Sequence, residues 1–115
     1  MGEESMSQKT PDMIQGTLDM LILKVLNLEP MHGWGITKRI QQSSDGALQV
    51  NQGSLYTSLV RMTRAGWIES EWQITENNRR ARYYRLTPSG QKRLLEEEGR
   101  WARLTSAVEQ ILALN

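Results

Sequence analysis

Apolar residues recur at helical spacing between residues 12 and 28, and this recurrence predicts the first helix of the chain. Positions i, i+3, i+4 and i+7 share one face of a helix, so an apolar repeat at that spacing is typical of an amphipathic helix. The residues that follow the repeat are Leu18, Leu21, Ile22, Val25 and Leu26. Met20, Leu23 and Leu28 lie off that stripe. The helix is therefore apolar over more of its circumference than one core contact requires, and we expect a second buried face.

A short second helix is predicted after Pro30, which ends the first one. Residues 31–35, Met-His-Gly-Trp-Gly, are expected to form a turn. Ile36 and Ile40 then mark one face of a short helix. A polar turn closes it before a brief extended segment at residues 47–50.

The third predicted helix has a signal at each end. Asn51 can act as its N-cap, because the side-chain oxygen of asparagine accepts hydrogen bonds from the free N–H groups of the first turn. Its buried face consists of Leu55, Leu59 and Met62. Gly66 is expected to adopt a left-handed conformation after the last turn, with Trp67 folding back on Met62 in a Schellman ending.

Strand periodicity replaces helical periodicity after Gly66. Ile68, Ser70, Trp72 and Ile74 alternate with Glu69, Glu71 and Gln73. This alternation predicts a strand with one mostly apolar side. Residues 81–86 offer a second strand, in which the adjacent Tyr83 and Tyr84 must face opposite sides. A polar, basic connection at residues 75–80 completes a predicted β-hairpin.

The last predicted helix begins with Thr87 as N-cap and Pro88 at the first helical position, and it runs to about residue 113. It carries an apolar seam with spacings of 7, 3, 4 and 3, typical of coiled-coil a and d positions. The seam residues are Leu94, Trp101, Leu104, Val108 and Ile111. The seam is too short for an independent coiled coil, so it needs another surface.

We expect that surface to be the spare face of the first helix in a second copy of the chain, which makes the protein a homodimer. The residues predicted for the interface are Leu18, Leu21, Leu23, Leu94, Trp101, Leu104, Val108 and Ile111. The alternative is that the last helix packs on its own domain.

Together these elements predict a mainly α fold with a small β-hairpin. Their order is that of a winged helix-turn-helix with an extra C-terminal dimerisation helix. We expect a flexible N-terminal arm at residues 1–11, the winged domain at residues 12–87 and the dimerisation helix at residues 88–115.

Composition narrows the class of protein. A chain of 115 residues is the size of one domain. It contains no cysteine, which excludes disulfides, thiolate metal sites and a cysteine nucleophile. No secretion signal is recognisable, and no apolar run approaches the roughly 18 residues that span a bilayer. We therefore expect a cytoplasmic protein without membrane partners.

The net charge of +1 hides an uneven distribution. Residues 61–93 contain eight basic and three acidic residues, a local charge of +5, whereas residues 1–60 and 94–115 each carry −2. A local basic surface, rather than a basic total, is what a nucleic-acid-binding protein needs.

The third helix and the hairpin carry this positive charge and form the predicted DNA-binding surface. The 100° rotation per residue places small polar and cationic side chains opposite the buried face of the helix. Such a face fits the major groove, and arginine either bonds guanine or neutralises phosphate. The predicted DNA-binding residues are Gln52, Ser54, Tyr56, Thr57, Arg61 and Arg64 on the helix and Arg79, Arg80 and Arg82 at the hairpin.

Simpler interpretations exist for each part of this surface. A polar outer face is typical of any surface helix, and Tyr56 could instead pack on the second helix. A basic hairpin can discourage aggregation between strand edges, although lysine would serve that purpose as well as arginine. The alternative function is a winged helix that contacts other proteins without binding DNA.

An enzyme is not expected. The single histidine, His32, lies between turn residues without a second metal ligand at useful spacing, so a structural hydrogen bond is its expected role. Glu96, Glu97 and Glu98 are consecutive on a helix and fan outward instead of converging on a substrate. We therefore expect neither a catalytic site nor a metal or cofactor.

Four stretches of the chain resemble the PadR-type transcriptional regulators, especially their short-tailed branch. They are Gly16-Thr17-Leu18-Asp19, Met31-His32-Gly33-Trp34-Gly35-Ile36, Gly53-Ser54-Leu55-Tyr56 and Arg82-Tyr83-Tyr84-Arg85-Leu86-Thr87-Pro88-Ser89-Gly90. The resemblance covers about residues 13–112. It implies a winged-helix repressor that dimerises through its first and last helices and contacts operator DNA through helix three and the wing. Thr57 replaces a proline and Trp34 a tyrosine that many relatives have.

The resemblance also suggests an effector. Some relatives bind phenolic acids or flat aromatic drugs at the dimer centre through a tryptophan on the last helix. Trp101 is the corresponding residue here, and the alternative is that it packs in the interface without a ligand. A homodimer with two reading helices would recognise a near-palindromic operator.

Overall fold

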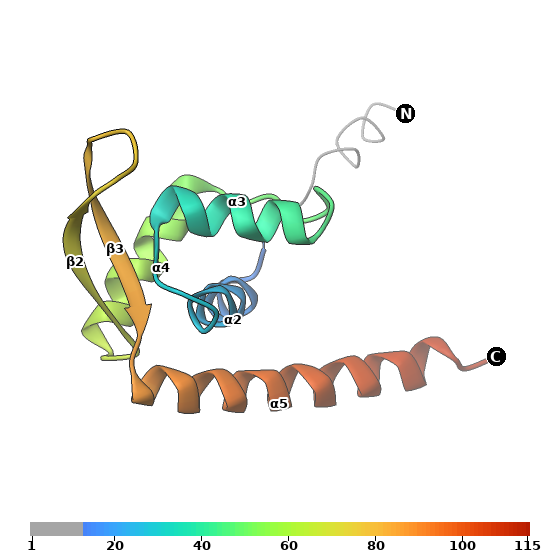
Figure 1. Ribbon diagram of the computed structural model, residues 1–115. Coiled ribbons are helices and arrows are strands. Elements are labelled where there is room, and N and C mark those ends of the chain that lie inside the picture. The colour runs from blue at the N-terminus through green and yellow to red at the C-terminus, as the bar shows by residue number, and fades with distance from the viewer. Residues whose placement is uncertain (1–12) are drawn as a thin grey trace.

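Four helices and three strands make up residues 13–115, the part of the chain that the computed structural model describes (Figure 1). In chain order they are α2 Gln15–Leu26, β1 Met31–His32, α3 Gly33–Ser43, α4 Gln52–Arg64, β2 Ile68–Ile74, β3 Arg80–Leu86 and α5 Pro88–Leu112. This is a winged helix-turn-helix with a long C-terminal helix, as predicted. The flexible arm expected at residues 1–11 lies outside the described residues.

Helix α2 lies at the centre of the fold and contacts α3, α4, α5 and β3. Its buried side chains belong to both of the apolar faces that the sequence indicated: Leu18, Ile22, Leu23, Val25 and Leu26. The second buried face is therefore real. Elements of the same chain cover it, and the N-terminal part of α5 is one of them.

This packing corrects part of the predicted dimer interface. Leu18, Leu23 and Leu94 are 4%, 0% and 3% exposed and belong to the core of the chain itself. The first turns of α5 lie against α2, where Lys24 also approaches Glu98 at 3.9 Å, and Leu18 lies beside the start of α4. Leu21 is partly buried beside the same core.

Helix α3 begins earlier than predicted, since residues 33–35 are helical and do not form a turn. His32 is its N-cap, and the Nδ1 atom accepts a hydrogen bond from the Gly35 backbone N at 3.0 Å. Met31 and His32 form a two-residue strand that pairs with Tyr84 and Tyr83 of β3. A histidine cap followed by two glycines is a weak helix signal, which explains the error.

The two ends of α4 follow the prediction. Asn51 Oδ1 accepts a hydrogen bond from the Ser54 backbone N at 2.9 Å. At the other end Gly66 has a φ of +81°, and the Trp67 backbone N donates to the Met62 carbonyl at 3.1 Å. That pair of features is the predicted Schellman ending. The extended segment expected at residues 47–50 is not a strand in the structure.

The three strands form an antiparallel sheet in the order β1, β3, β2. Tyr84 is buried and Tyr83 is partly exposed on the other face, as the alternation required. After the sheet, Thr87 caps α5 by accepting a hydrogen bond from the Gly90 backbone N at 3.0 Å, and Pro88 takes the first helical position as predicted.

The distal half of α5 extends away from the body of the domain (Figure 1). Its seam residues are exposed: Trp101 46%, Leu104 55%, Val108 45% and Ile111 66%. Nowhere between residues 13 and 115 is a helix both long enough and apolar enough to cross a membrane.

Candidate nucleic-acid interface

The exposed face of α4 and one face of the β2–β3 hairpin lie next to each other and form a continuous surface. Tyr56 of α4 lines one cleft together with Arg80 and Arg82 of β3. Arg64 of α4 and Arg82 line the neighbouring hollow. We call this region the α4–wing surface and define it by Tyr56, Thr57, Val60, Arg64, Trp72, Arg80 and Arg82, with the partly exposed Arg61 at its border.

The cleft between the hairpin and the helices has a volume of about 400 Å³. Tyr56 closes one side of it by packing on the start of α3. A Cβ atom at Gly33 would lie 2.8 Å from the Tyr56 hydroxyl, so the absence of a side chain there makes room for the ring. The position of Tyr56 therefore depends on a glycine in another helix.

One face of the hairpin presents arginines stacked on a tryptophan. The guanidinium carbons of Arg80 and Arg82 lie 4.9 Å and 5.0 Å from the centroid of the Trp72 ring. Arg82 also donates a hydrogen bond to Ser70 Oγ at 3.3 Å. Within residues 13–115 no carboxylate lies within 4.0 Å of either guanidinium. Among the described residues both positive charges are therefore uncompensated on this face.

The opposite face of the hairpin is electrostatically neutralised. Arg85 donates to Glu69 at 2.7 Å and to Glu71 at 3.1 Å. The hydrogen bond with Glu69, followed by the attraction of its charge, raises the pKa of Arg85. Arg93 likewise pairs with Glu97 at 3.1 Å. The arginines of the basic segment therefore divide into compensated ones, those of the α4–wing surface, and Arg79 in the hairpin connection.

Arg61 does not occupy the exposed position predicted for it. Its guanidinium donates to Asp19 Oδ1 at 2.8 Å, and Asp19 is a residue of the central helix with 7% exposure. The hydrogen bond to Asp19 raises the pKa of Arg61. The rotation of α4 turns this side chain toward α2, where a nearly buried carboxylate needs a partner. Arg61 therefore ties α4 to α2 while 35% of its side chain stays exposed, and its predicted contact with DNA stays a prediction.

Some of the other predicted DNA-binding residues lie on the α4–wing surface, and others lie outside it. Gln52 donates from Nε2 to Thr37 Oγ1 at 2.8 Å and so links the start of α4 to α3. Ser54 is exposed near the start of α2. Arg79 is exposed in the hairpin connection, where its backbone N bonds Thr75 Oγ1 at 3.3 Å. Tyr56, Thr57, Arg64, Arg80 and Arg82 are the predicted residues that the structure brings together.

Three apolar residues of this region were not identified from the sequence. Trp34 is 57%, Val60 50% and Trp72 54% exposed. Strand alternation had placed Trp72 on the inner, apolar side of β2. The hairpin extends beyond the helices at its tip (Figure 1), so the inner side is covered near Ile68 and open at Trp72. The pairing of Trp72 with Arg82 in the hairpin register was the available signal.

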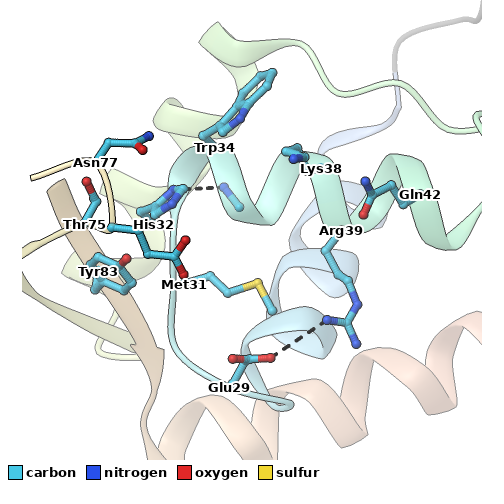
Figure 2. Close-up of a pocket in the computed structure, with 12 residues that line it drawn as sticks. Glu29, Met31, His32, Trp34, Lys38, Arg39, Gln42, Thr75, Asn77 and Tyr83 are labelled. Atoms are coloured by element: carbon cyan, nitrogen blue, oxygen red, sulfur yellow. Dashed lines mark hydrogen bonds and ion pairs between the residues drawn. The ribbon is translucent and has the colours of Figure 1, made fainter. Parts of the chain in front are cut away.

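A second cleft, of about 500 Å³, lies on the other side of β1, between α3 and the hairpin connection (Figure 2). His32 stands at its centre, with Nδ1 engaged in the cap of α3 and its ring in edge-to-face contact with Tyr83 at 5.3 Å. Glu29 and Arg39 pair across another part of the cleft at 3.9 Å. The predicted structural hydrogen bond of His32 is thus confirmed.

Comparisons with known proteins agree on one family. A family model described as the transcriptional regulator PadR-like family matches residues 22–96. A solved transcriptional regulator from Clostridium thermocellum is 27% identical, with a TM-score of 0.76, and the match covers 83% of this chain and 89% of that one. A PadR family transcriptional regulator from Eggerthella lenta is 32% identical, with a TM-score of 0.74 and coverages of 87% and 85%.

A relative known from its sequence, an uncharacterised protein from Lysinibacillus sphaericus, is 26% identical over 98 residues. The match covers 85% of this chain and 90% of that protein. The family model and the two solved structures describe transcriptional regulators and no enzyme.

The ion pair between α2 and α4 predicts a stability effect. Asp19→Leu and Arg61→Met are each expected to lower the free energy of unfolding by about 1–3 kcal/mol, because each removes one partner of the hydrogen-bonded ion pair. The double variant should lose less than the sum of the two single changes. Urea denaturation followed by circular dichroism measures all three.

The matched control is Arg64→Ala, one helical turn further along α4. Arg64 is exposed and has no ion-pair partner within the described residues, so its removal should change stability by less than about 0.5 kcal/mol. An Arg61→Met protein as stable as Arg64→Ala would contradict the internal role of Arg61.

Proposed function

Because this chain belongs to the PadR-like family of transcriptional regulators, we propose that it represses transcription in the cytoplasm by binding a near-palindromic operator as a homodimer. The observation that carries the proposal is the α4–wing surface, which joins an exposed helix face to uncompensated arginines. In this model α4 enters the major groove and the wing contacts the phosphates beside it.

The start of α4 suits close approach to DNA. Gly53 and Ser54 are small and exposed, and they precede Tyr56 and Thr57 on the same helix. The N-terminus of a helix also favours phosphate through its free N–H groups and its dipole. Arg64 near the end of α4 and the wing arginines then supply the charge for backbone contacts.

The dimer half of the proposal rests on the distal part of α5. Its four exposed seam residues form an apolar stripe, and such a stripe on a projecting helix is stabilised by a partner surface. Since Leu18 and Leu23 are already buried, two leucines are left for a second copy, and we call them the ridge: Leu21, half-buried on α2, and Leu28, 55% exposed in the turn after α2. We propose that the seam of one copy packs on this ridge of the other.

Salt dependence tests DNA binding. Binding to DNA from the region upstream of the protein's own gene should weaken steeply as salt rises, because cationic contacts release counterions from the phosphates. In Arg80→Ala/Arg82→Ala the slope of log Kobs against log salt should fall by up to about 1.8 for each subunit, or about 3.6 for the dimer. Fluorescence anisotropy at several salt concentrations measures it.

Arg85→Ala is the control for this experiment, because Arg85 lies on the same strand but is held by two glutamates on the opposite face. Its affinity and slope should match those of the wild type. Binding that is absent or independent of salt would favour the alternative, a winged helix that contacts only proteins.

The proposed dimer predicts a mass in solution of about twice 13.2 kDa. Val108→Glu should shift the protein toward the monomer, because it places a charge in the apolar seam. Ser106→Glu, on the opposite side of α5 by helical rotation, should stay dimeric. Sedimentation at micromolar concentration measures the mass, and a wild type that is a monomer there would contradict the dimer.

We propose further that a small planar aromatic effector binds at the dimer centre beside Trp101. The exposed indole in the seam supports this proposal, since an aromatic ring gives a flat ligand a stacking surface. Titration with planar aromatic compounds should quench part of the tryptophan fluorescence and release the DNA. If Trp101→Ala protein responds as the wild type does, Trp101 is not the site.

A further inference from the structure

Trp72 occupies an unusual place for the largest side chain of the wing. It is 54% exposed, so more than half of its surface contributes nothing to the core. The hairpin register sets it directly opposite Arg82 and diagonal to Arg80, so all three side chains share one face of the sheet. Both guanidinium groups lie about 5 Å from the centre of its ring.

From this arrangement we propose that Trp72 is a positioning residue for DNA binding, which holds Arg80 and Arg82 side by side toward the DNA backbone. The inference rests on the proposed function. It assigns a role to Trp72, which is uncharged and lies outside the four stretches that resemble the family. Trp72 acts through the two arginines and not through a contact of its own.

A positioning residue helps here because arginine side chains are flexible and repel each other. A free arginine side chain samples many rotamers, and binding must restrict them at an entropic cost. Two neighbouring guanidinium groups also repel each other. The negative face of an indole attracts both cations and reduces their freedom before DNA arrives. The hydrogen bond from Arg82 to Ser70 restrains one of them further.

A second arginine that stacks on a tryptophan, Arg93, differs from Arg80 and Arg82 because a carboxylate neutralises its charge. Arg93 lies 4.5 Å from the centre of the Trp67 ring, and Glu97 pairs with it at 3.1 Å. Glu97 therefore neutralises the positive charge of Arg93 within the domain. Arg80 and Arg82 have the stacking contact without an acidic partner among residues 13–115, so their charge stays available to an anion.

The location of the stack fits a strand of DNA. Trp72, Arg80 and Arg82 line the cleft that Tyr56 of α4 closes on the other side. A helix in the major groove and a wing beside it flank the same stretch of backbone. Phosphates of that stretch would pass the cleft, within reach of both arginines.

The test measures DNA binding of the full chain at several salt concentrations. Trp72→Leu is expected to bind about tenfold more weakly at a fixed salt concentration, because Arg80 and Arg82 are then no longer ordered before DNA binds. Its salt slope should equal that of the wild type, since every charge remains, whereas Arg80→Ala/Arg82→Ala lowers the slope. Trp72→Phe keeps an aromatic face and should retain most of the affinity.

A double-mutant comparison separates positioning from direct contact. In the Arg80→Ala/Arg82→Ala background, Trp72→Leu should have no further effect. A further loss there would show that Trp72 touches DNA itself and would overturn the proposal, as would a Trp72→Leu protein that binds like the wild type. Thermal melting verifies that each variant is folded. If the wild type itself shows no salt-dependent binding, the proposed function fails and the positioning role falls with it.

Discussion

The enclosure of α2 by its own chain is the constraint on which the rest of the structure depends. This helix is apolar around most of its circumference, and α3, α4, the sheet and the first turns of α5 are all placed by covering it. A helix of 25 residues is about 37 Å long. The core needs only its beginning, with Leu94 as the last deeply buried residue. The remainder projects, and its apolar seam is left for other contacts.

The same enclosure explains how α4 is held. Asp19 is a carboxylate on the buried helix and needs a cationic partner, which α4 provides through Arg61. Gln52 bonds Thr37 at the start of α4, and Tyr56 fits against Gly33 in its first turns. The helix proposed to read DNA is therefore attached by polar and steric contacts along its length, in addition to its apolar face. Its exposed residues are therefore carried by a helix that is anchored to α2 and α3.

Local signals accounted for most of the fold. The asparagine cap, the Schellman glycine and the threonine-proline start of α5 act within a few residues, so the sequence around them was sufficient for prediction. The start of α3 was missed because its cap is an imidazole nitrogen and β1 has only two residues, whose pairing partner lies about 50 positions away. The ion pair of Arg61 was missed for the same reason, since its partner Asp19 lies 42 positions earlier in the chain.

By itself the sequence determined the order and type of every element except β1, the wing with its arginines and the apolar seam of the last helix, because hydrophobic period, caps and local charge are read over short distances. Only the tertiary structure decided which arginines are free. Arg61, Arg85 and Arg93 are compensated by carboxylates, while Arg80 and Arg82 are stacked on Trp72 and remain available. It also decided which leucines are buried within the chain. The physical reason is that an ion pair or a covered face depends on which residues meet in space, and those contacts arise when α2 is packed.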